Sequence, residues 1–306
     1  MQQGILIAGA SGLIGKSLVQ MFLKQGFPVH TLGRSAVQAL PGTKHFTWDI
    51  NNGRIREGAF DSIAHIINLA GENIAGGRWT QQRKQQILDS REKSTELLLS
   101  AAKSQSANIV TYVSASAVGF YGAVTNETIN TESSGPANDF LGTTCARWEA
   151  AADQFESLGS RVVKIRIGVV LTSKGGALEK MATPARYGLG AVLGSGRQYL
   201  PWIHIEDLCR IFAMAIANER IKGPYNAVAP QYTTMREFTI ALGAALHKPV
   251  WLPPVPGWLL KLAMGEMSLM VLEGSRVSPD KIISAGYNFR FSDVGTALQD
   301  LLGQPV

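Results

Sequence analysis

Short apolar runs rich in β-branched residues alternate, over the first 170 residues, with longer segments whose apolar positions repeat every three or four residues. The first run, residues 5–8, is followed by Leu13, Leu18, Met21 and Phe22 at helical spacing. Such runs are typical of strands buried on both faces of a parallel sheet, and such segments of amphipathic helices. Further strands are expected at residues 29–32, 45–48, 65–69, 108–114 and 162–167, and helices at residues 13–25, 80–105 and 143–158.

This alternation indicates strand–helix–strand units, which build a parallel sheet covered by helices on both faces. After about residue 170, glycine-rich loops and a proline cluster surround shorter elements. The predicted fold class is therefore α/β, a Rossmann-type doubly wound parallel sheet with a smaller C-terminal substrate lobe. The expected Rossmann domain covers residues 1–170 with 200–230, and the expected substrate or cap lobe covers residues 171–199 and 231–306.

A glycine-punctuated turn, Gly9-Ala-Ser-Gly-Leu-Ile-Gly15, joins the first run to the first helix. A strand that stops at glycines and turns into a helix aims backbone N–H groups and the positive end of the helix dipole at one point. That point suits a pyrophosphate, and the position of the motif between a strand and a helix favours nucleotide binding over a purely structural turn. The candidate residues are Gly9, Ser11, Gly12, Leu13, Ile14 and Gly15.

The composition narrows the function classes. The chain of 306 residues is 45% apolar and 17% charged, as expected of a globular protein with a sizeable core. Its net charge is +6, but no run of Lys and Arg concentrates that charge, so a small-molecule partner is expected and nucleic acid is not.

Cysteine usage and apolar stretches indicate the compartment. Cys145 and Cys209 lack metal-ligand spacing and are expected as free thiols in a reducing cytosol, with no metal site. The N-terminus carries no signal-peptide pattern, and the longest apolar stretch, residues 255–272, is interrupted by Lys261 and Glu266. A cytoplasmic protein without stable membrane association is predicted.

Four motifs occur in an order shared with a known superfamily. They are Gly9-Ala-Ser-Gly-Leu-Ile-Gly15, Asn68-Leu-Ala-Gly71, Tyr112-Val-Ser-Ala-Ser-Ala-Val118 and Trp202-Ile-His-Ile-Glu-Asp-Leu208. On these motifs the chain resembles the short-chain dehydrogenase/reductase superfamily, in its extended branch of nucleotide-sugar epimerases and dehydratases. Asn68-Leu-Ala-Gly-Glu-Asn73, Cys145-Ala-Arg-Trp-Glu149 and the C-terminal segment are similar to the group called "epimerase family protein". The resemblance implies a nicotinamide dinucleotide cofactor and a homodimer through the helices at 80–105 and 143–158.

The end of the second predicted strand indicates which cofactor to expect. Arg34 follows this strand, and no acidic residue stands between Gly15 and Pro41. An NAD-selective site usually carries an acid here for the ribose 2′-hydroxyl, whereas a guanidinium pairs with the 2′-phosphate of NADP(H). NADP is therefore the predicted cofactor, and a solvated surface arginine is the alternative.

The resemblance adds cofactor contacts at the ends of the other predicted strands. The implied set is Asp49, Leu69, Ala70, Gly71, Glu72, Arg78, Ser114 and Val169. Asp49 would lie beside the adenine, and a turn cap is the alternative for it. Glu72 and Arg78 would touch the ribose or diphosphate, and the alternative is that they pair with each other at the surface.

The superfamily's catalytic residues are only partly present. The resemblance implies a Ser that positions the substrate, a Tyr that exchanges a proton with the substrate oxygen, and a Lys that lowers the pKa of this Tyr. Ser116 matches the serine. Aligning the following helix on Glu149 puts Leu141 at the Tyr position and Cys145 at the Lys position. The usual acid/base pair is therefore missing.

Substitutes for this pair are few, because residues 122–186 hold no Tyr and residues 104–163 hold no Lys. Ser116 and Tyr121 are the candidate catalytic residues, with packing at a strand end as the alternative for Tyr121. Cys145 would be a nucleophile only with a lowered pKa.

The substrate stretch departs from the superfamily as well. Nucleotide-sugar enzymes carry an Arg that clamps the diphosphate, but here Leu200 takes its position and Pro201 that of the following Asp. A buried diphosphate without its guanidinium would cost several kcal/mol unless Arg197 compensated from a shifted place. A small substrate other than a nucleotide sugar is therefore expected.

The lobe also carries large apolar residues between positions 251 and 270. Met and Leu at helical spacing usually form core, which is the first interpretation, and a hydrophobic substrate site or partner surface is the second. These residues are Trp251, Pro253, Pro254, Trp258, Leu259, Leu262, Met264, Met267 and Met270.

Two functions of different classes follow. The first is an NADP(H)-dependent oxidoreductase or epimerase with a rewired acid/base, acting on a small carbonyl or alcohol. The second is a catalytically silent NADP(H)-binding regulatory or sensor protein. The absent Tyr and Lys favour the second, and the retained Ser116 favours the first. Docking of residues 255–272 on a membrane or a partner is a third, more remote hypothesis.

Overall fold

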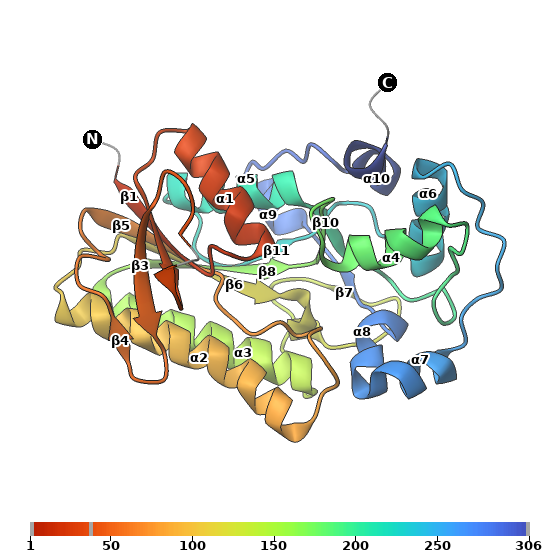
Figure 1. Ribbon diagram of the computed structural model, residues 1–306, viewed down its shortest axis with the longest axis horizontal. Helices are drawn as coiled ribbons and strands as arrows, with labels where there is room; N and C mark the ends of the chain where they lie inside the picture. Colours follow the sequence, from red (N-terminus) through yellow and green to blue (C-terminus); the bar gives the residue numbers. More distant parts are fainter. Residues whose placement is uncertain (1–2, 37–38, 304–306) are drawn as a thin grey trace.

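The computed structural model describes residues 3–36 and 39–303, and within them one large sheet organises the fold (Figure 1). The sheet has eight strands in the order β11-β8-β6-β5-β1-β2-β3-β4. Neighbouring strands are parallel except for β4, which runs antiparallel to β3. The strands are β1 (Gly4–Ala8), β2 (Val29–Gly33), β3 (Lys44–Asp49), β4 (Arg54–Ile55), β5 (Ile63–Asn68), β6 (Thr111–Ala117), β8 (Arg161–Ile167) and β11 (Gly223–Ala227).

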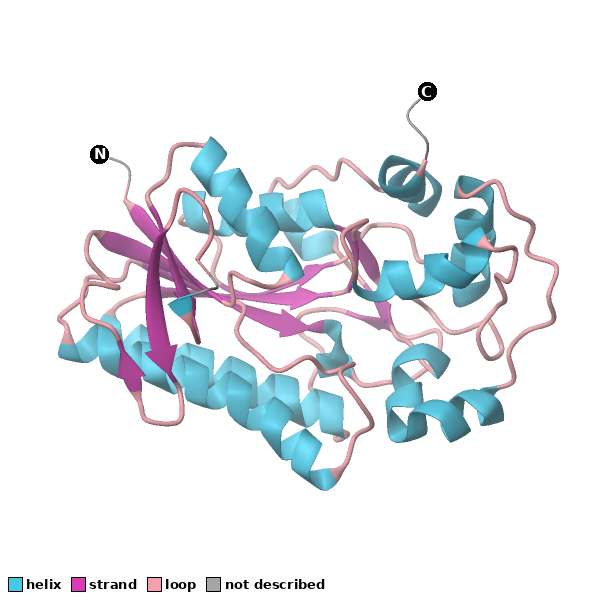
Figure 2. Cartoon of the chain, in the orientation of Figure 1, coloured by secondary structure: helices cyan, strands magenta, loops and turns pink. Residues whose placement is uncertain are grey.

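Helices cover both faces of this sheet, as Figures 1 and 2 show. Helices α1 (Leu13–Lys24) and α5 (Ile205–Ala217) lie on one face, where Phe22 and Phe212 enter its core. Helix α2 (Gln81–Ser104) covers the other face through Leu98, with α3 (Phe140–Asp153) beside it. The α/β doubly wound fold predicted from the sequence is confirmed.

Most of the remaining elements lie beyond the main sheet, at the end of the molecule opposite the N-terminus (Figure 1). Strands β9 (Val169–Leu171) and β10 (Trp202–His204) pair in parallel, as do β7 (Ile129–Asn130) and β12 (Arg276–Val277). Around β9 and β10, a second buried cluster includes Leu178 of α4 (Gly176–Arg186), Phe238 of α6 (Met235–Ala245) and Leu298 of α10 (Val294–Leu302). The short helices α7 (Gly257–Met264) and α8 (Leu269–Leu272) complete the lobe, whereas α9 (Asp280–Ser284) packs on β11 and its Ile282 joins the core that contains Phe22 and Phe212. The domain boundaries expected from the sequence stay a prediction.

The main-sheet elements that the hydrophobic pattern missed are the short β4 and β11. β11 reads Gly-Pro-Tyr-Asn-Ala and contains no apolar run. Its place beside β8 is fixed by backbone pairing, which the hydrophobic pattern does not show. Among the described residues, no helix combines the length and apolarity needed to cross a bilayer.

The first interpretation of the apolar residues at 251–270 is wrong, because none of the nine is buried: six are exposed and three are half-buried. Trp251 is 68% exposed, and on α7 Trp258, Leu259 and Leu262 are 68%, 43% and 68% exposed. The second cluster is filled instead by α4, α6 and α10. Helical spacing alone cannot tell a face buried in the core from a face left in solvent.

Candidate functional site

The glycine turn has the geometry of an anion site. Gly9 has a φ of +78°, and a Cβ on it would lie 2.8 Å from the backbone carbon of Leu69. A Cβ on Gly15 would lie 2.6 Å from the Cα of Ala10, so the helix packs directly on the turn. Both positions therefore need glycine, the first because of its positive φ as well as for space.

Gly12, the N-cap of α1, differs from its two neighbours in the motif. Its φ is −73°, and a Cβ on it would meet only the carbonyl oxygen of Gly9, at 3.4 Å. No side chain caps the helix here, the first turn carries no acid, and Ser11, Gly12 and Leu13 are exposed while Ile14 is half-buried. The positive end of α1 is thus open to an anionic ligand.

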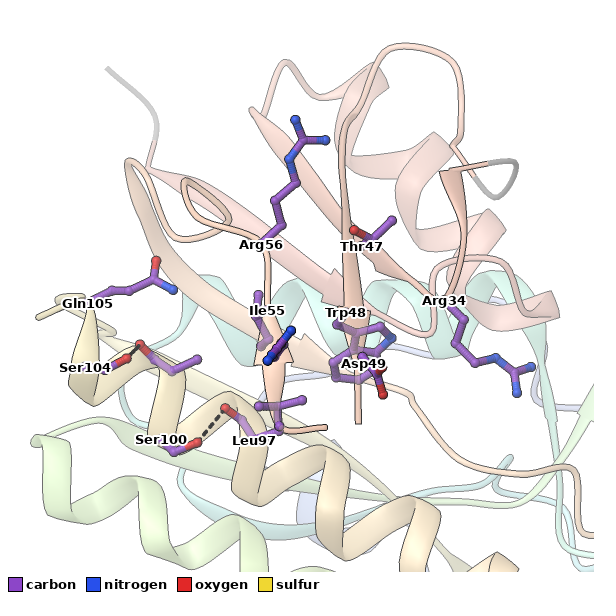
Figure 3. A pocket seen from close by; sticks show the side chains of 13 residues that line it. Arg34, Thr47, Trp48, Asp49, Ile55, Arg56, Leu97, Ser100, Ser104 and Gln105 are labelled. Atoms are coloured by element: carbon purple, nitrogen blue, oxygen red, sulfur yellow. Dashed lines mark hydrogen bonds between the residues drawn. The ribbon is translucent and has the colours of Figure 1, made fainter. Parts of the chain in front are cut away.

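Arg34 follows β2 and is 75% exposed, with its guanidinium 3.5 Å from the carboxylate of Glu72. A cavity of about 800 Å³ opens beside it, between the β3–β4 hairpin and α2. Figure 3 shows Arg34 and Asp49 at one side of this cavity and Gln105, the residue after α2, at the other. The cavity lining does not include the glycine turn.

Asp49 is held by its own turn. Its carboxylate accepts hydrogen bonds from the backbone N–H of Asn51 at 3.0 Å, from that of Asn52 at 3.1 Å and from the Asn52 side chain at 2.7 Å. These bonds from Asn52 lower the pKa of Asp49. In this structure the alternative of a turn cap applies, and the adenine contact stays a prediction.

Glu72 and Arg78 do not pair with each other. Glu72 lies 3.2 Å from Arg83 of α2 in addition to Arg34. Arg78 donates hydrogen bonds to the carbonyl oxygens of Leu262 at 2.7 Å and Ala263 at 3.1 Å, so it caps the C-terminus of α7. The surface pairing considered from the sequence is therefore wrong.

The segment after β5 approaches the glycine turn. The N–H of Leu69 donates to the carbonyl oxygen of Ala8 at 2.9 Å, and the N–H of Ala70 donates to the Asn68 side chain at 3.0 Å. Asn68 is fully buried and donates in turn to Tyr112 at 2.9 Å. Because β5 and β1 are neighbours, this rigid segment and the turn share one edge of the sheet.

Two other candidate cofactor contacts, Ser114 and Val169, lie on strands and are less exposed than Gly12 of the glycine turn. Ser114 on β6 is fully buried, and its hydroxyl donates to the carbonyl oxygen of Ala115 at 2.9 Å. Val169 begins β9, is half-buried, and its N–H donates to the carbonyl oxygen of Pro201 at 2.7 Å.

Ser116, at the end of β6, belongs to a buried polar network. Its hydroxyl donates to the Glu149 carboxylate at 2.7 Å, and Arg166 of β8 donates to both oxygens of that carboxylate, at 2.8 and 2.9 Å. Arg166 also donates to the Tyr121 hydroxyl at 2.9 Å, which donates to the Asn226 side chain at 2.7 Å. All five side chains are buried.

This network commits both candidate catalytic residues to internal partners. Burial raises the pKa of Tyr121 despite the neighbouring Arg166, so its phenol stays protonated. Burial lowers the pKa of Arg166, but the hydrogen bonds and charge attraction of Glu149 and Tyr121 together outweigh burial and leave this pKa raised. The Arg166 guanidinium lies 3.5 Å from the Phe120 ring centroid, which fixes it further.

The register inferred from Glu149 agrees with these contacts. Glu149 faces Ser116, and a Cβ on Gly119 would lie 3.4 Å from Leu141 and 3.9 Å from the Cys145 sulfur. All three α3 residues thus point to the end of β6. Burial raises the pKa of Cys145 to about 12, so the condition for a nucleophile, a lowered pKa, is not met.

Arg91 of α2 was missed by sequence reasoning. A Cβ on Gly71 would lie 3.1 Å from its guanidinium carbon, which also lies 4.9 Å from the Trp148 ring centroid. Its charge acts on Cys145, at the position where the resemblance implies Lys. No local signal could have found it, because the proximity comes from the packing of α2 on α3.

Leu200 and Pro201, the two departures in the substrate stretch, are both engaged within the protein. Leu200 is 6% exposed in the second core, and its N–H donates to the carbonyl oxygen of Thr233 at 2.8 Å. The carbonyl oxygen of Pro201 is used by Val169, and Arg197 is exposed.

Comparisons with known proteins agree with this geometry. The sequence profile of the NAD dependent epimerase/dehydratase family matches residues 5–227, and that of a domain of unknown function, DUF1731, matches residues 255–301. The epimerase family protein YfhF of Bacillus subtilis (strain 168) is 37% identical over 298 residues, which cover 97% of either chain. The epimerase family protein SDR39U1 of Mus musculus is 35% identical and covers 97% of this chain and 99% of its own.

Solved structures show the same fold. The crystal structure of human epimerase family protein SDR39U1 (isoform 2) with NADPH matches with a TM-score of 0.87 and 33% identity, over 97% of this chain and 98% of that one. A nucleoside-diphosphate sugar epimerase from Corynebacterium glutamicum matches with a TM-score of 0.80 and 30% identity, over 99% of this chain and 59% of that one.

Proposed function

The chain belongs to the NAD dependent epimerase/dehydratase family, and from this premise we propose that it is an NADP(H)-binding oxidoreductase or epimerase that works without the Tyr–Lys pair. Its substrate would be small and not a nucleotide sugar. The observation that carries the proposal is the open N-terminus of α1, where Gly12 leaves room for a pyrophosphate and no side chain caps the helix.

Cofactor choice is supported by Arg34. Its exposed guanidinium follows β2, and Glu72, the carboxylate beside it, also pairs with Arg83, so two cations surround one acid. A 2′-phosphate would add an anion to this cluster, and a charge-assisted contact with Arg34 would favour it. The human relative SDR39U1, 33% identical, was crystallised with NADPH.

The residues near the bound nicotinamide ring would hold and orient the substrate, and would exchange protons with it only slowly. When bound, the nicotinamide ring supplies a hydride donor or acceptor. Arg91, beside Gly71, would provide the positive charge that the absent Lys provides in the superfamily. The Ser116 hydroxyl donates a hydrogen bond to Glu149, so its oxygen is left as an acceptor for a substrate hydroxyl. This arrangement suits an alcohol better than a carbonyl.

The substrate class is limited by the missing clamp. Leu200 is buried in the second core, and Pro201 uses its carbonyl oxygen within the backbone. Neither position can compensate a diphosphate, whose burial without a partner is costly.

The test compares the dissociation constants of NADPH and NADH by calorimetry. We expect NADPH to bind at least about tenfold tighter, since one charge-assisted contact contributes roughly 1.5–3 kcal/mol. Arg34→Ala should remove most of this difference, whereas the charge-matched control Arg220→Ala, an exposed residue after α5, should keep it. Equal affinities in the unmodified protein would contradict the cofactor assignment.

A catalytically silent NADP(H)-binding protein is the second candidate, favoured by the engagement of both Ser116 and Tyr121 inside the buried network. A panel of alcohols with NADP⁺ and of carbonyls with NADPH separates the two functions. Tight NADPH binding with no hydride transfer to or from any member would select the silent protein.

A further inference from the structure

Helix α7 is apolar except for Lys261 and yet buries none of its residues. Seven of its eight residues, Gly-Trp-Leu-Leu-Lys-Leu-Ala-Met, are uncharged, and Trp258 and Leu262 are each 68% exposed. A helix that is apolar all round is normally covered. Exposing this face of α7 to water therefore costs free energy that nothing else in the fold explains.

The body of the protein fixes which face of α7 is exposed. Arg78 donates to the carbonyl oxygens of Leu262 and Ala263, at the C-terminus of the helix. Immediately after α7, Glu266 forms an ion pair with Lys84 of α2 at 2.6 Å. These contacts attach the helix to the Rossmann half by its end, and leave Trp258, Leu259 and Leu262 facing solvent.

Other large apolar side chains lie at the same end of the molecule. Trp251 is 68% exposed, and Tyr187 and Leu189 are 79% and 57% exposed. The two segments that carry them run together, since the N–H of Gly194 donates to the carbonyl oxygen of Val255 at 3.0 Å and the N–H of Val255 donates to that of Val192 at 2.8 Å. Figure 1 shows the end of α4, the chain leading to α7, and α7 itself at the end of the long axis opposite the N-terminus. We call Tyr187, Leu189, Trp251, Trp258, Leu259 and Leu262 the apolar end.

All charges of the segments that form the apolar end have one sign. Residues 183–191 contain Arg186 and no acid, and residues 244–265 contain Lys248 and Lys261 and no acid. All three side chains are exposed. Aromatic and aliphatic residues interleaved with Lys and Arg are the composition of a surface that enters the headgroup region of an anionic membrane.

We propose that the apolar end docks this protein peripherally on an anionic lipid surface, with α7 lying in the plane of the interface. Eight residues of helix extend about 12 Å, too short to span a bilayer but sufficient to lie in its interface. Trp258 and Leu262 enter the acyl boundary, while Lys248 and Lys261 meet the headgroups. A second copy of the chain is a poorer occupant, because pairing two such surfaces would bring six cations together without an acid.

The experiment is cosedimentation of the full chain with vesicles of phosphatidylcholine alone and of phosphatidylcholine mixed with phosphatidylglycerol. We expect binding to the mixed vesicles, a blue shift of tryptophan fluorescence, and loss of binding at high salt. Trp258→Ser with Leu262→Ser should weaken binding at least about tenfold, because the apolar area entering the lipid is lost. The matched control, Val110→Ser with Ile283→Ser, changes exposed apolar residues elsewhere and should bind as the unmodified chain does.

A charge test separates lipid docking from other occupants. Lys248→Glu with Lys261→Glu should abolish the preference for mixed vesicles, whereas Lys24→Glu with Lys103→Glu should retain it. Unchanged NADPH affinity reports that each variant is folded. Failure of the unmodified chain to bind mixed vesicles overturns the proposal, and so does a dimer in sedimentation equilibrium that Trp258→Ser with Leu262→Ser dissociates. Neither result bears on the proposed cofactor.

Discussion

The carboxyl ends of β1 and β6 lie at the same edge of one sheet but are built in opposite ways. After β1, the backbone of the glycine turn and the first turn of α1 face outward, and Gly12 is exposed without a side-chain partner. After β6, Ser116 is 2% exposed, and its hydroxyl is bound inside the network of Glu149, Arg166 and Tyr121. The end after β1 leaves the first turn of α1 without a side-chain cap, and the end after β6 has its polar side chains bound to one another.

This difference separates binding from chemistry. A pyrophosphate at the glycine turn would replace only water, so binding there needs no rearrangement. A substrate that used Ser116 as a proton donor would first have to break its charge-assisted hydrogen bond to Glu149, which contributes roughly 1.5–3 kcal/mol. One that used Tyr121 would have to break the buried hydrogen bond to the Asn226 amide, which contributes roughly 0.5–1.5 kcal/mol. The proposed function therefore combines cofactor binding that needs no rearrangement with slow proton transfer.

The largest effect is expected from breaking the buried network after β6. Arg166→Leu leaves the Glu149 carboxylate buried and unpaired, which should lower the free energy of unfolding by about 3–5 kcal/mol. Urea denaturation measures it. The control Arg147→Ala removes an ion pair with Glu92 in which Arg147 is 53% exposed, and should cost less than about 1 kcal/mol. Similar losses in both variants would mean that the network does not differ from a surface ion pair.

Substitutions of two glycines in one motif test the glycine turn after β1. Gly12→Val should weaken NADPH binding about a hundredfold, because the side chain displaces a phosphate held by backbone N–H groups at roughly 1.5 kcal/mol or more for each. Its melting temperature should stay unchanged, because the φ of −73° and the 3.4 Å contact tolerate a Cβ. Gly15→Val should instead lower the melting temperature, since its Cβ would overlap Ala10. Undiminished NADPH binding by folded Gly12→Val would show that the turn is not the site.

The smallest effect is expected at Ser116. Ser116→Ala removes one hydrogen bond to Glu149 and the acceptor for substrate, so turnover should fall about tenfold and stability by about 1 kcal/mol. Cys145→Ala is the control, and it should leave turnover within about twofold, because a thiol whose pKa is raised to about 12 by burial is not a nucleophile. Steady-state rates at saturating cofactor measure both. Turnover that depends on Cys145 and not on Ser116 would reverse the assignment.

The sequence predicted the parallel sheet and the glycine turn because both signals are local. Apolar runs such as residues 5–8 indicate a strand buried on two faces. A glycine turn between a strand and a helix indicates that backbone N–H groups are directed at one point. The absence of the Tyr–Lys pair was also visible, since Glu149 set the helix register and the structure places Leu141 and Cys145 as that register requires.

Contacts between distant elements were decided only by the tertiary structure. Tyr121 and Asn226 are 105 residues apart, so no spacing in the chain relates the phenol to its partner. Arg91 reaches Gly71 and acts on Cys145 because α2 packs beside α3. Trp258 and Leu262 are exposed because other helices, α4, α6 and α10, fill the second cluster. Local sequence determines what each segment can form, whereas its partners and its exposure depend on the packing of the whole chain.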